Sequence, residues 1–289
     1  PLPLSIYNQL KMYHRFRIRM RYLRKMHRWL NLDNPKTFNE KLQWLKAYDL
    51  NPMYTDIVDK YAVKAIIADK IGKEYLIPTL AIYDSPADID WESLPDRFVL
   101  KCTHDSGGVV VCQDKSSLDK EAALRKLWKH YKRNYYYNKR EWPYKNIKPR
   151  ILAEQYMEDR QGDGELKDYK FFCFDGEPKL LFVASDRHKK VETKFDFFDM
   201  DYNHLPIKNG HPNSEVPPAR PETFEQMKAL ASELSKGFPH VRVDLYEIEG
   251  KIYFGELTLY HYSGTTPFEP ASWDEKLGSW IKLPELPKH

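Results

Sequence analysis

Two carboxylate side chains near the end of the sequence, Asp244 and Glu256, are the residues best suited to hold a metal ion. They lie in two alternating segments, Val241 to Ile248 and Lys251 to Leu259, on either side of the turn Glu249-Gly250, and this pattern predicts a β-hairpin. Two acidic groups at neighbouring strand positions repel each other unless a cation lies between them, and carboxylate oxygens favour Mg²⁺. Taken alone, however, the hairpin slightly favours a charged face exposed to solvent.

The same hairpin carries a basic and a hydroxyl side chain beside the two carboxylates. Because side chains alternate along a strand, Arg242 shares a face with Asp244, and Thr258 shares a face with Glu256. The hairpin therefore offers a guanidinium group and a hydroxyl group next to a candidate Mg²⁺ site.

A second candidate element is the lysine at the end of the strand predicted for Arg97 to Lys101. The turn after it contains Ser106-Gly107-Gly108, where the absence of bulky side chains allows backbone N–H groups to approach a phosphate. The sequence does not have the Walker A pattern. Taken alone, a plain hairpin turn beside an exposed Lys101 is the more common structure.

Two further segments could contribute to a nucleotide site. Ile151 to Tyr156 is a short apolar strand that ends in Glu154-Gln155-Tyr156, and such a strand end can offer backbone donors and acceptors to an adenine held between apolar walls. An ordinary strand end is the more common explanation. Asp168 and Lys170 share a face of the next strand, where Lys170 could contact a phosphate or form an exposed ion pair of little energetic value.

The elements that must position these residues follow from periodicity and from capping signals. Thr37 and Glu40 form a capping box, which predicts that a helix begins there and runs to Tyr48. Hairpins prevail among the strands, so the predicted class is α+β. The remaining elements expected are helices at 6–30, 56–71, 117–137 and 222–236, an edge strand or loop at 75–82, strands at 109–112, 168–174, 179–184 and 195–199, and a loop at 205–221.

Charge divides the chain unevenly. Residues 1–32 contain eight Lys and Arg residues and no Asp or Glu, so this segment carries +8 while the remainder carries −4. Its predicted helix is amphipathic, and it could dock on the body, contact an anionic membrane or bind an anionic substrate. A nucleic-acid-binding function is disfavoured because the body is acidic and no reader motif is present.

The sequence also bears on the cellular compartment. No run of apolar residues is long enough to span a membrane, and the first residues lack the apolar core of a signal peptide. The three cysteines, Cys102, Cys112 and Cys173, form no CxxC pair, which disfavours a disulfide framework or a zinc site. We therefore expect a cytoplasmic protein, with peripheral contact at the inner face of the membrane as an open alternative.

The order of these motifs resembles the ATP-grasp superfamily, and their details are similar to the TupA-like (teichuronopeptide biosynthesis) branch. The resemblance covers roughly residues 30–270. It is carried by Asn34-Pro35-Lys36-Thr37-Phe38-Asn39-Glu40-Lys41, Asp59-Lys60-Tyr61-Ala62-Val63, Phe98-Val99-Leu100-Lys101, Trp142-Pro143-Tyr144-Lys145-Asn146-Ile147-Lys148-Pro149-Arg150 and Gly255-Glu256-Leu257-Thr258.

The resemblance implies an ATP-grasp fold in which two α+β lobes clamp ATP. The implied organisation is a basic helical arm (1–32), an N-terminal helical region (33–95), a first lobe (96–155) and a second lobe with the metal site (156–289). It implies ATP-binding roles for Lys60, Lys101, Ser106, Gly107, Gly108, Glu154, Gln155 and Tyr156, catalytic roles for Lys170 and Arg242, and Mg²⁺ ligands at Asp244, Glu256 and Thr258. Many ATP-grasp enzymes have Asn at the position of Thr258, and a hydroxyl is the weaker ligand.

The chemistry implied is ATP-dependent joining of a carboxylate to an amine through an acyl phosphate. The carboxylate is expected to be that of a uronic acid or glutamate in a bacterial cell-surface polysaccharide, and the amine that of an amino acid or amino sugar. Five aromatic residues could stack on sugar rings or belong to the core: Tyr135, Tyr136, Tyr137, Trp142 and Tyr144. The main alternative is a glycosyltransferase that uses a sugar nucleotide, for which Asp199-Met200-Asp201 is a short and unspecific signal. A non-enzymatic nucleic-acid-binding protein is the other alternative.

Overall fold

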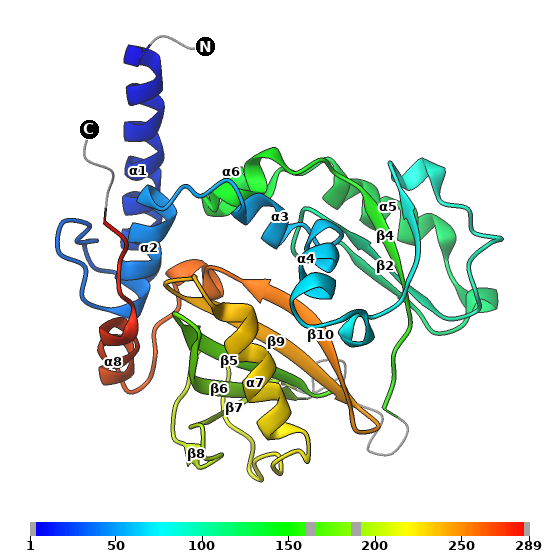
Figure 1. The fold of residues 1–289 in the computed structure, drawn as a ribbon. Helices are drawn as coiled ribbons and strands as arrows, with labels where there is room; N and C mark the ends of the chain where they lie inside the picture. Colours follow the sequence, from blue (N-terminus) through cyan, green and yellow to red (C-terminus); the bar gives the residue numbers. More distant parts are fainter. Residues whose placement is uncertain (1–3, 160–165, 186–191, 286–289) are drawn as a thin grey trace.

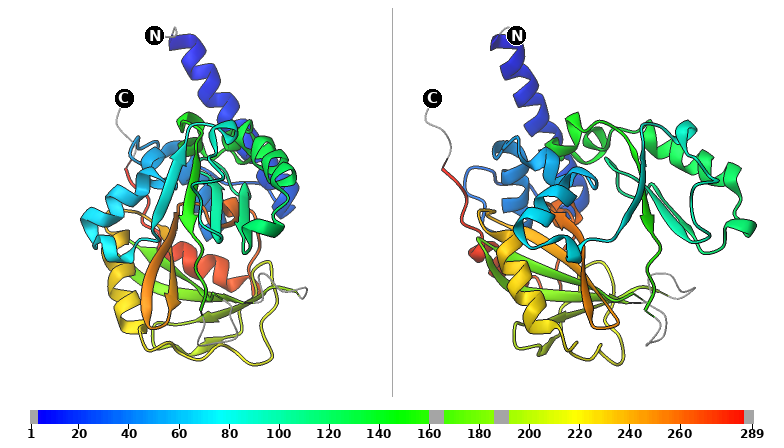
Figure 2. Two further views of the ribbon diagram at one scale, coloured as in Figure 1. Left: turned by 90° about the vertical axis from the view of Figure 1, so that its right-hand side faces the viewer. Right: turned by 45° about the vertical axis from the view of Figure 1, so that its right-hand side comes forward.

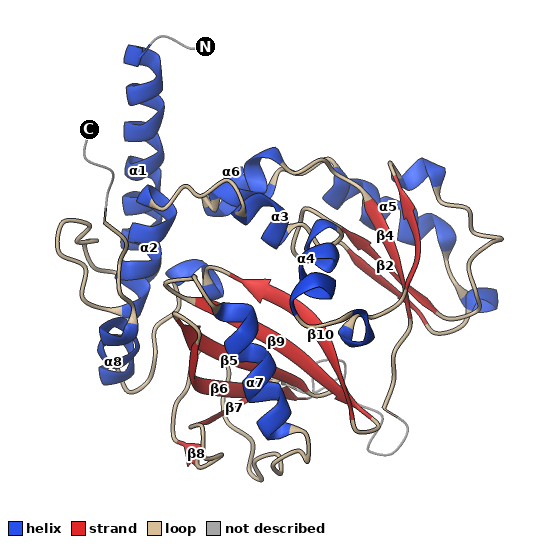
Figure 3. Ribbon diagram, in the orientation of Figure 1, coloured by secondary structure: helices blue, strands red, loops and turns tan. Residues whose placement is uncertain are grey.

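The computed structural model describes residues 4–159, 166–185 and 192–285, and it contains two antiparallel sheets with helices around them (Figures 1 and 3). The smaller sheet has the strand order β1-β4-β2-β3, and the larger one has the order β10-β9-β5-β6-β7-β8. Every adjacent pair of strands is antiparallel, which confirms the α+β class.

The smaller sheet is built from short apolar strands and is covered on one face by a helix. Its core is formed by side chains such as Phe98, Leu100 and Ile151, and Leu127 packs on them from helix α5 (Lys120–Tyr131). The segment 75–82, which was expected to be an edge strand or a loop, contributes most of β1, the first strand at the edge of this sheet. The strands are β1 (Thr79–Tyr83), β2 (Phe98–Cys102), β3 (Val109–Cys112) and β4 (Ile151–Gln155).

The larger sheet packs against helix α7 (Phe224–Ser235) and contains the predicted C-terminal hairpin. The two residues of its turn, Glu249 and Gly250, both have positive φ angles (51° and 74°), as expected for a tight hairpin turn. The strands are β5 (Asp168–Phe174), β6 (Glu177–Ser185), β7 (Lys194–Phe198), β8 (His204–Leu205), β9 (Val241–Ile248) and β10 (Lys251–Thr258).

The helices α1 (Leu4–Met26), α2 (Phe38–Tyr48), α3 (Tyr54–Val58) and α4 (Ala62–Lys70) precede the sheets in the chain. The capping box at the start of α2 is confirmed: the Thr37 side chain accepts a hydrogen bond from the Glu40 N–H group, and the Glu40 carboxylate accepts one from the Thr37 N–H group. Two other helices are α6 (Tyr135–Lys139) and α8 (Ser272–Trp280), which packs on α2 and which the sequence did not indicate.

Two predicted helices are each divided in two. The segment 56–71 breaks because the Asp59 carboxylate accepts hydrogen bonds from the N–H groups of Tyr61 and Ala62, and so caps the start of α4 instead of continuing α3. The segment 117–137 breaks before Asn134, whose side chain caps α6. Both breaks use short polar side chains that compete with the helical backbone.

Helix α1 docks on the body through its C-terminal half. Ile18 and Tyr22 are fully buried, and His14 forms hydrogen bonds with the Lys46 carbonyl (3.1 Å) and with the hydroxyl of Tyr136 (3.1 Å). Its first turns extend away from the rest of the molecule (Figure 2). Among the helices in the described part of the chain, none is long and apolar enough to cross a membrane.

Candidate active site

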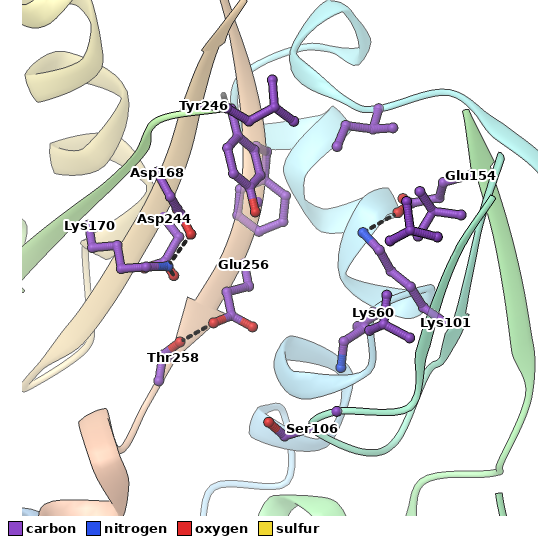
Figure 4. A pocket seen from close by; sticks show the side chains of 18 of the residues that line it. Lys60, Lys101, Ser106, Glu154, Asp168, Lys170, Asp244, Tyr246, Glu256 and Thr258 are labelled. Atoms are coloured by element: carbon purple, nitrogen blue, oxygen red, sulfur yellow. Dashed lines mark hydrogen bonds and ion pairs between the residues drawn. The ribbon is translucent and has the colours of Figure 1, made fainter. Parts of the chain in front are cut away.

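A pocket of about 1510 Å³ is lined by residues of both sheets (Figure 4). One wall belongs to the smaller sheet and the helices beside it, and the other belongs to β5, β9 and β10. Of the residues singled out in the sequence, those that line it are Lys60, Lys101, Ser106, Gly107, Tyr135, Tyr144, Glu154, Gln155, Tyr156, Asp168, Lys170, Arg242, Asp244, Glu256 and Thr258. Gly108 does not line it: a Cβ atom there would lie 2.8 Å from both Cys102 Sγ and His130 Cβ, so close packing requires this glycine.

A β-bulge in β10 determines how the two carboxylates meet. From Lys251 to Phe254 the strand pairs regularly with β9, but Gly255 is an extra residue, so Glu256 pairs with Asp244. Without the bulge, Glu256 would lie opposite Val243 and on the other face of the sheet. On the far side of β9, Lys170 of β5 also pairs with Asp244. Lys170, Asp244 and Glu256 thus form one row across three strands.

Arg242 joins this row into a single network. Its Nε and Nη2 atoms donate to the two oxygens of Asp244 at 2.7 Å each, a bidentate pair. Nη2 also donates to Glu256 Oε1 (3.0 Å) and Thr258 Oγ1 (3.0 Å), and Lys170 donates to Asp244. Both Arg242 and Asp244 are buried, so the hairpin does not present a solvated charged face here.

The two carboxylates differ in their electrostatic surroundings. The side chain of Asp244 is 1% exposed and that of Glu256 is 49% exposed, toward the pocket. Burial raises the pKa of Asp244 to about 6, although Arg242 and Lys170 oppose this. Burial also acts to raise the pKa of Glu256, but Arg242, Lys170 and Lys60 outweigh it and lower the pKa to about 2. Both groups are therefore ionised at neutral pH.

Two residues that the sequence did not indicate hold Arg242 in place. Nη1 of Arg242 donates to His261 Nδ1 (2.7 Å), and His261 Nε2 in turn donates to Asn209 Oδ1 (2.8 Å). Burial and the charge of Arg242 hold the pKa of His261 well below its usual value, so the ring is neutral and can accept from Arg242. No sequence pattern reveals this chain of contacts, because its members lie far apart in the sequence.

The opposite wall presents lysines and a glycine turn. The break between α3 and α4 lets the backbone N–H group of Lys60 bond to the Thr103 carbonyl (3.2 Å), and its Nζ atom donates to the Asp105 carbonyl (2.6 Å). Gly107 has a φ angle of 102°, which favours glycine. Lys60 and the Ser106-Gly107 turn are thereby held together on one wall of the pocket.

The side chain of Glu154 is buried between two lysine side chains. Its buried carboxylate pairs with Lys101 Nζ (2.7 Å) and with Lys64, which the sequence reading missed. Lys64 also donates to the Ile77 carbonyl (2.7 Å), which ties α4 to the start of β1. Burial acts to raise the pKa of Glu154, but the two lysines outweigh it and lower the pKa.

Gln155 and Tyr156, which follow Glu154 in the chain, make contacts of their own. The Gln155 N–H group donates to the Pro78 carbonyl (3.0 Å), and the Tyr156 hydroxyl accepts from Gln113 Nε2 (2.9 Å). Apolar side chains from both walls lie nearby and could flank a planar ring: Leu76, Val99, Val111, Met157, Leu166 and Phe254.

The pocket fits ATP and Mg²⁺ in size and in donor chemistry. Its volume exceeds the range of roughly 300–1,000 Å³ typical of a single small ligand, which leaves room for a second substrate. In residues 4–159, 166–185 and 192–285, no group of three or more His, Cys, Asp or Glu side chains could hold a metal ion. Asp244 and Glu256 would therefore need phosphate oxygens or water to complete the coordination of Mg²⁺.

The acidic motif Asp199-Met200-Asp201 lies elsewhere. The Asp199 carboxylate accepts hydrogen bonds from the N–H groups of Asp201 (3.0 Å) and Asn203 (2.8 Å), so it stabilises a turn after β7. It does not line the pocket.

The chain is similar to one known protein family and to several solved structures. The model of the TupA-like ATP-grasp family matches residues 40–282. No curated protein sequence matches the chain. Solved structures with a similar fold include the ATP-grasp ligase PsnB complexed with a minimal precursor (10% identity, TM-score 0.42). The match covers 72% of this chain and 53% of that one. This chain thus spans about half of the length of that structure.

Two other similar structures are D-alanine–D-alanine ligases. The enzyme from Helicobacter pylori is 15% identical, with a TM-score of 0.46, and the match covers 88% of this chain and 69% of that one. The enzyme from Bacillus anthracis complexed with ATP is 15% identical, with a TM-score of 0.45, and the match covers 79% and 65% of the two chains. The family match spans most of the sequence and includes both walls of the pocket, and it shows that the chain belongs to the TupA-like ATP-grasp family.

Proposed function

We propose that this protein is an ATP- and Mg²⁺-dependent ligase that joins a carboxylate to an amine through an acyl phosphate. The observation that carries the proposal is the opposition of two walls in one pocket. Lys60, Lys101 and the Ser106-Gly107 turn form a phosphate-binding wall, and the row that contains Asp244 and Glu256 forms a carboxylate wall. A nucleotide that bridges the walls would have its phosphates between them.

Each wall has a defined task in this reaction. Lys60, Lys101 and backbone N–H groups of the turn bind and orient the phosphates, while the apolar side chains near Tyr156 exclude water from the base. Asp244 and Glu256 would hold Mg²⁺, with Thr258 beside them, and this ion neutralises charge on the transferring phosphoryl group when bound. A weaker ligand at Thr258 makes the carboxylates the principal protein ligands.

Arg242 and Lys170 supply the positive charge of the reaction centre. In the structure they neutralise Asp244, Glu256 and Asp168, which would otherwise repel one another. A substrate carboxylate that enters the pocket finds these cations next to the metal ligands. They would orient it toward the terminal phosphate and stabilise the negative charge that develops during transfer.

The acceptor carboxylate is proposed to be that of a uronic acid or glutamate in a bacterial cell-surface polysaccharide, and the amine that of an amino acid or amino sugar. Family membership and the room left beside a nucleotide support this choice. A cytoplasmic location is supported by the cysteines Cys102, Cys112 and Cys173, which are all buried and free.

Peripheral membrane contact through α1 is part of the same proposal. One face of α1, from the projecting turns into the docked half, exposes Leu10, Tyr13, Phe16 and Met20 at three- and four-residue spacing. Arginine residues lie around this apolar stripe. A helix of this kind can lie on an anionic membrane surface, near the site of polysaccharide assembly.

The test is an ATP turnover assay with paired panels of uronic-acid oligosaccharides, glutamyl compounds and amines, with mass spectrometry of the products. We expect ADP, phosphate and an amide in equal amounts, and loss of turnover when EDTA removes Mg²⁺. Transfer of ¹⁸O from a labelled carboxylate to the released phosphate would report the acyl phosphate. Turnover of sugar nucleotides without ATP would instead establish a glycosyltransferase.

A further inference from the structure

The pocket does not end at Glu256 but continues to α1. Arg21 and Lys25 of α1 and Lys139 of α6 line the same cavity as Asp244 and Glu256. The basic helix is therefore more than an appended arm, because two of its side chains belong to the wall of the candidate active site. We call Arg21, Lys25 and Lys139 the basic end of the pocket.

In the part of the chain that the structure describes, none of the three cations of the basic end forms an ion pair within 4 Å, although the charge of Glu141 acts on Arg21 and Lys139. Arg21 donates to the Asn138 carbonyl (3.3 Å), and its Nε atom is buried without a hydrogen-bond partner among the described residues. Lys139 is half-buried, and burial followed by the charge of Arg21 lowers its pKa. Three positive charges on one wall repel each other, so an anion there would relieve an unfavourable arrangement.

Among the described residues, Glu141 is the acidic side chain at this end of the pocket, and it has a cationic partner of its own. Glu141 is buried and interacts electrostatically with buried Lys46. Burial raises the pKa of Glu141 and lowers that of Lys46, so the two together contribute no net charge whether or not a proton moves between them. The net charge of the basic end is thus positive.

Lys46 also holds the turn that contains Ser263, a residue that lines the pocket. Its Nζ atom donates to the carbonyl (2.9 Å) and hydroxyl (3.1 Å) oxygens of Ser263. Tyr262 and Ser263 have φ angles of 47° and 58°, which are unfavourable for residues other than glycine. Gln43 donates to the carbonyls of Ser263 and Gly264, so buried donors hold this strained turn, η5 (His261–Gly264), against the pocket.

Aromatic side chains join the basic end to the carboxylate wall. Tyr135 and Tyr144 line the pocket and pack together, with ring centroids 4.8 Å apart. Burial raises the pKa of Tyr144 well above its usual value, and the charges of both Glu141 and Glu256 add to this effect. The tyrosine pair thus belongs to the wall of the same pocket as the basic end and Glu256.

We infer that the basic end binds carboxylate groups of an acidic oligosaccharide, beyond the sugar whose carboxylate reacts at Arg242 and Lys170. Cations would pair with uronate groups, and the tyrosine pair would pack against the apolar faces of the sugar rings. An acidic peptide would also pair with the cations, but it has no sugar rings to pack against the tyrosine pair. This inference rests on the proposed ligase function, since it assigns the acceptor of that reaction.

The direct test is binding of tetragalacturonate to the full chain, measured by calorimetry in the presence of a non-hydrolysable ATP analogue. Loss of one charge-assisted contact of roughly 1.5–3 kcal/mol should weaken binding by about 10-fold or more in Arg21→Ala and in Lys139→Ala. Arg21→Lys should retain part of the affinity. Arg24→Ala is the matched control, because Arg24 lies on the same helix, is exposed and does not line this pocket.

The outcomes separate the inference from the proposed function. Binding of the ATP analogue should be unchanged in every variant, and its absence in the unaltered protein would overturn the ligase proposal itself. If the analogue binds but tetragalacturonate does not, or binds equally to Arg21→Ala, Lys139→Ala and Arg24→Ala, the acidic-oligosaccharide inference fails. Tetraglutamate that binds more tightly, with the same dependence on Arg21, would identify an acidic peptide instead and also overturn it.

Discussion

At the scale of single residues, the site is notable for carboxylates that already have cationic partners. Asp244 receives both arms of Arg242 as well as Lys170, whereas Glu256 receives one hydrogen bond from Arg242 and one from Thr258. The two proposed metal ligands are therefore not equivalent. Asp244 also stabilises the fold. Glu256 faces the pocket, so its carboxylate can bind a ligand with less disturbance of the surrounding structure.

This difference predicts distinct results for two conservative substitutions. Glu256→Gln should abolish Mg²⁺-dependent ATP turnover with a smaller loss of stability than Asp244→Asn, because its side chain is half exposed. Asp244→Asn should abolish turnover and also destabilise the protein by about 3–5 kcal/mol, since it leaves Arg242 and Lys170 buried without their main partner. Turnover and chemical denaturation measure the two effects.

The exposed turn residue Glu249 provides the control for these substitutions. Glu249→Gln removes a carboxylate from the same hairpin, and it should leave turnover and stability unchanged. Full activity in both Glu256→Gln and Asp244→Asn would refute the metal assignment.

At the scale of elements, the bulge in β10 connects backbone geometry to the site. A Cβ atom on Gly255 would lie 3.0 Å from the Tyr246 ring and 3.1 Å from the Asp244 carbonyl oxygen, and the backbone cannot move freely. Gly255→Ala should therefore cost about 1–3 kcal/mol of stability through overpacking. It should also displace Glu256 from Asp244 and weaken the binding of Mg·ATP, which titration calorimetry would measure.

A second substitution in the same strand separates displacement of Glu256 from general destabilisation. Ile252 is buried in β10 but does not line the pocket, and Ile252→Val should cost roughly 0.5–1.5 kcal/mol. We expect this variant to retain its affinity for Mg·ATP. Equal affinity in Gly255→Ala and Ile252→Val would show that the bulge does not position the metal ligands.

The sequence predicts elements well where the signal is local. The alternating hairpin around Glu249-Gly250 and the capping box at Thr37 depend on neighbouring residues, and both are confirmed. The division of helix 56–71 and the network of His261 and Asn209 depend on contacts between distant segments, which no local period encodes. The glycine at 255 was a possible bulge signal, because glycine inside a strand often marks one.

At the scale of the whole molecule, one buried histidine joins the N-terminal helices to the larger sheet. His240 packs against Phe38 of α2 (4.9 Å between ring centroids) and against Phe172 and Phe174 of β5 (5.8 and 4.9 Å). Its Nδ1 atom donates to the Cys173 carbonyl (3.0 Å). Burial lowers the pKa of His240 to about 3, so the folded protein keeps this ring neutral.

This property predicts a decrease in stability with acid. The unfolded chain takes up a proton on His240 near pH 6.5 but the folded chain resists it until about pH 3, so the free energy of unfolding should fall as the pH decreases through this window. The loss amounts to about 1.4 kcal/mol per unit of pKa difference. His240→Asn can preserve the hydrogen bond to Cys173 without titrating, so its unfolding free energy should depend less steeply on pH than that of the unaltered protein.

Denaturant titrations between pH 4 and 7 would measure both slopes, with His27→Asn, at an exposed histidine, as the control. Parallel profiles for the unaltered protein and His240→Asn would mean that the contact between α2 and the larger sheet does not depend on a neutral His240.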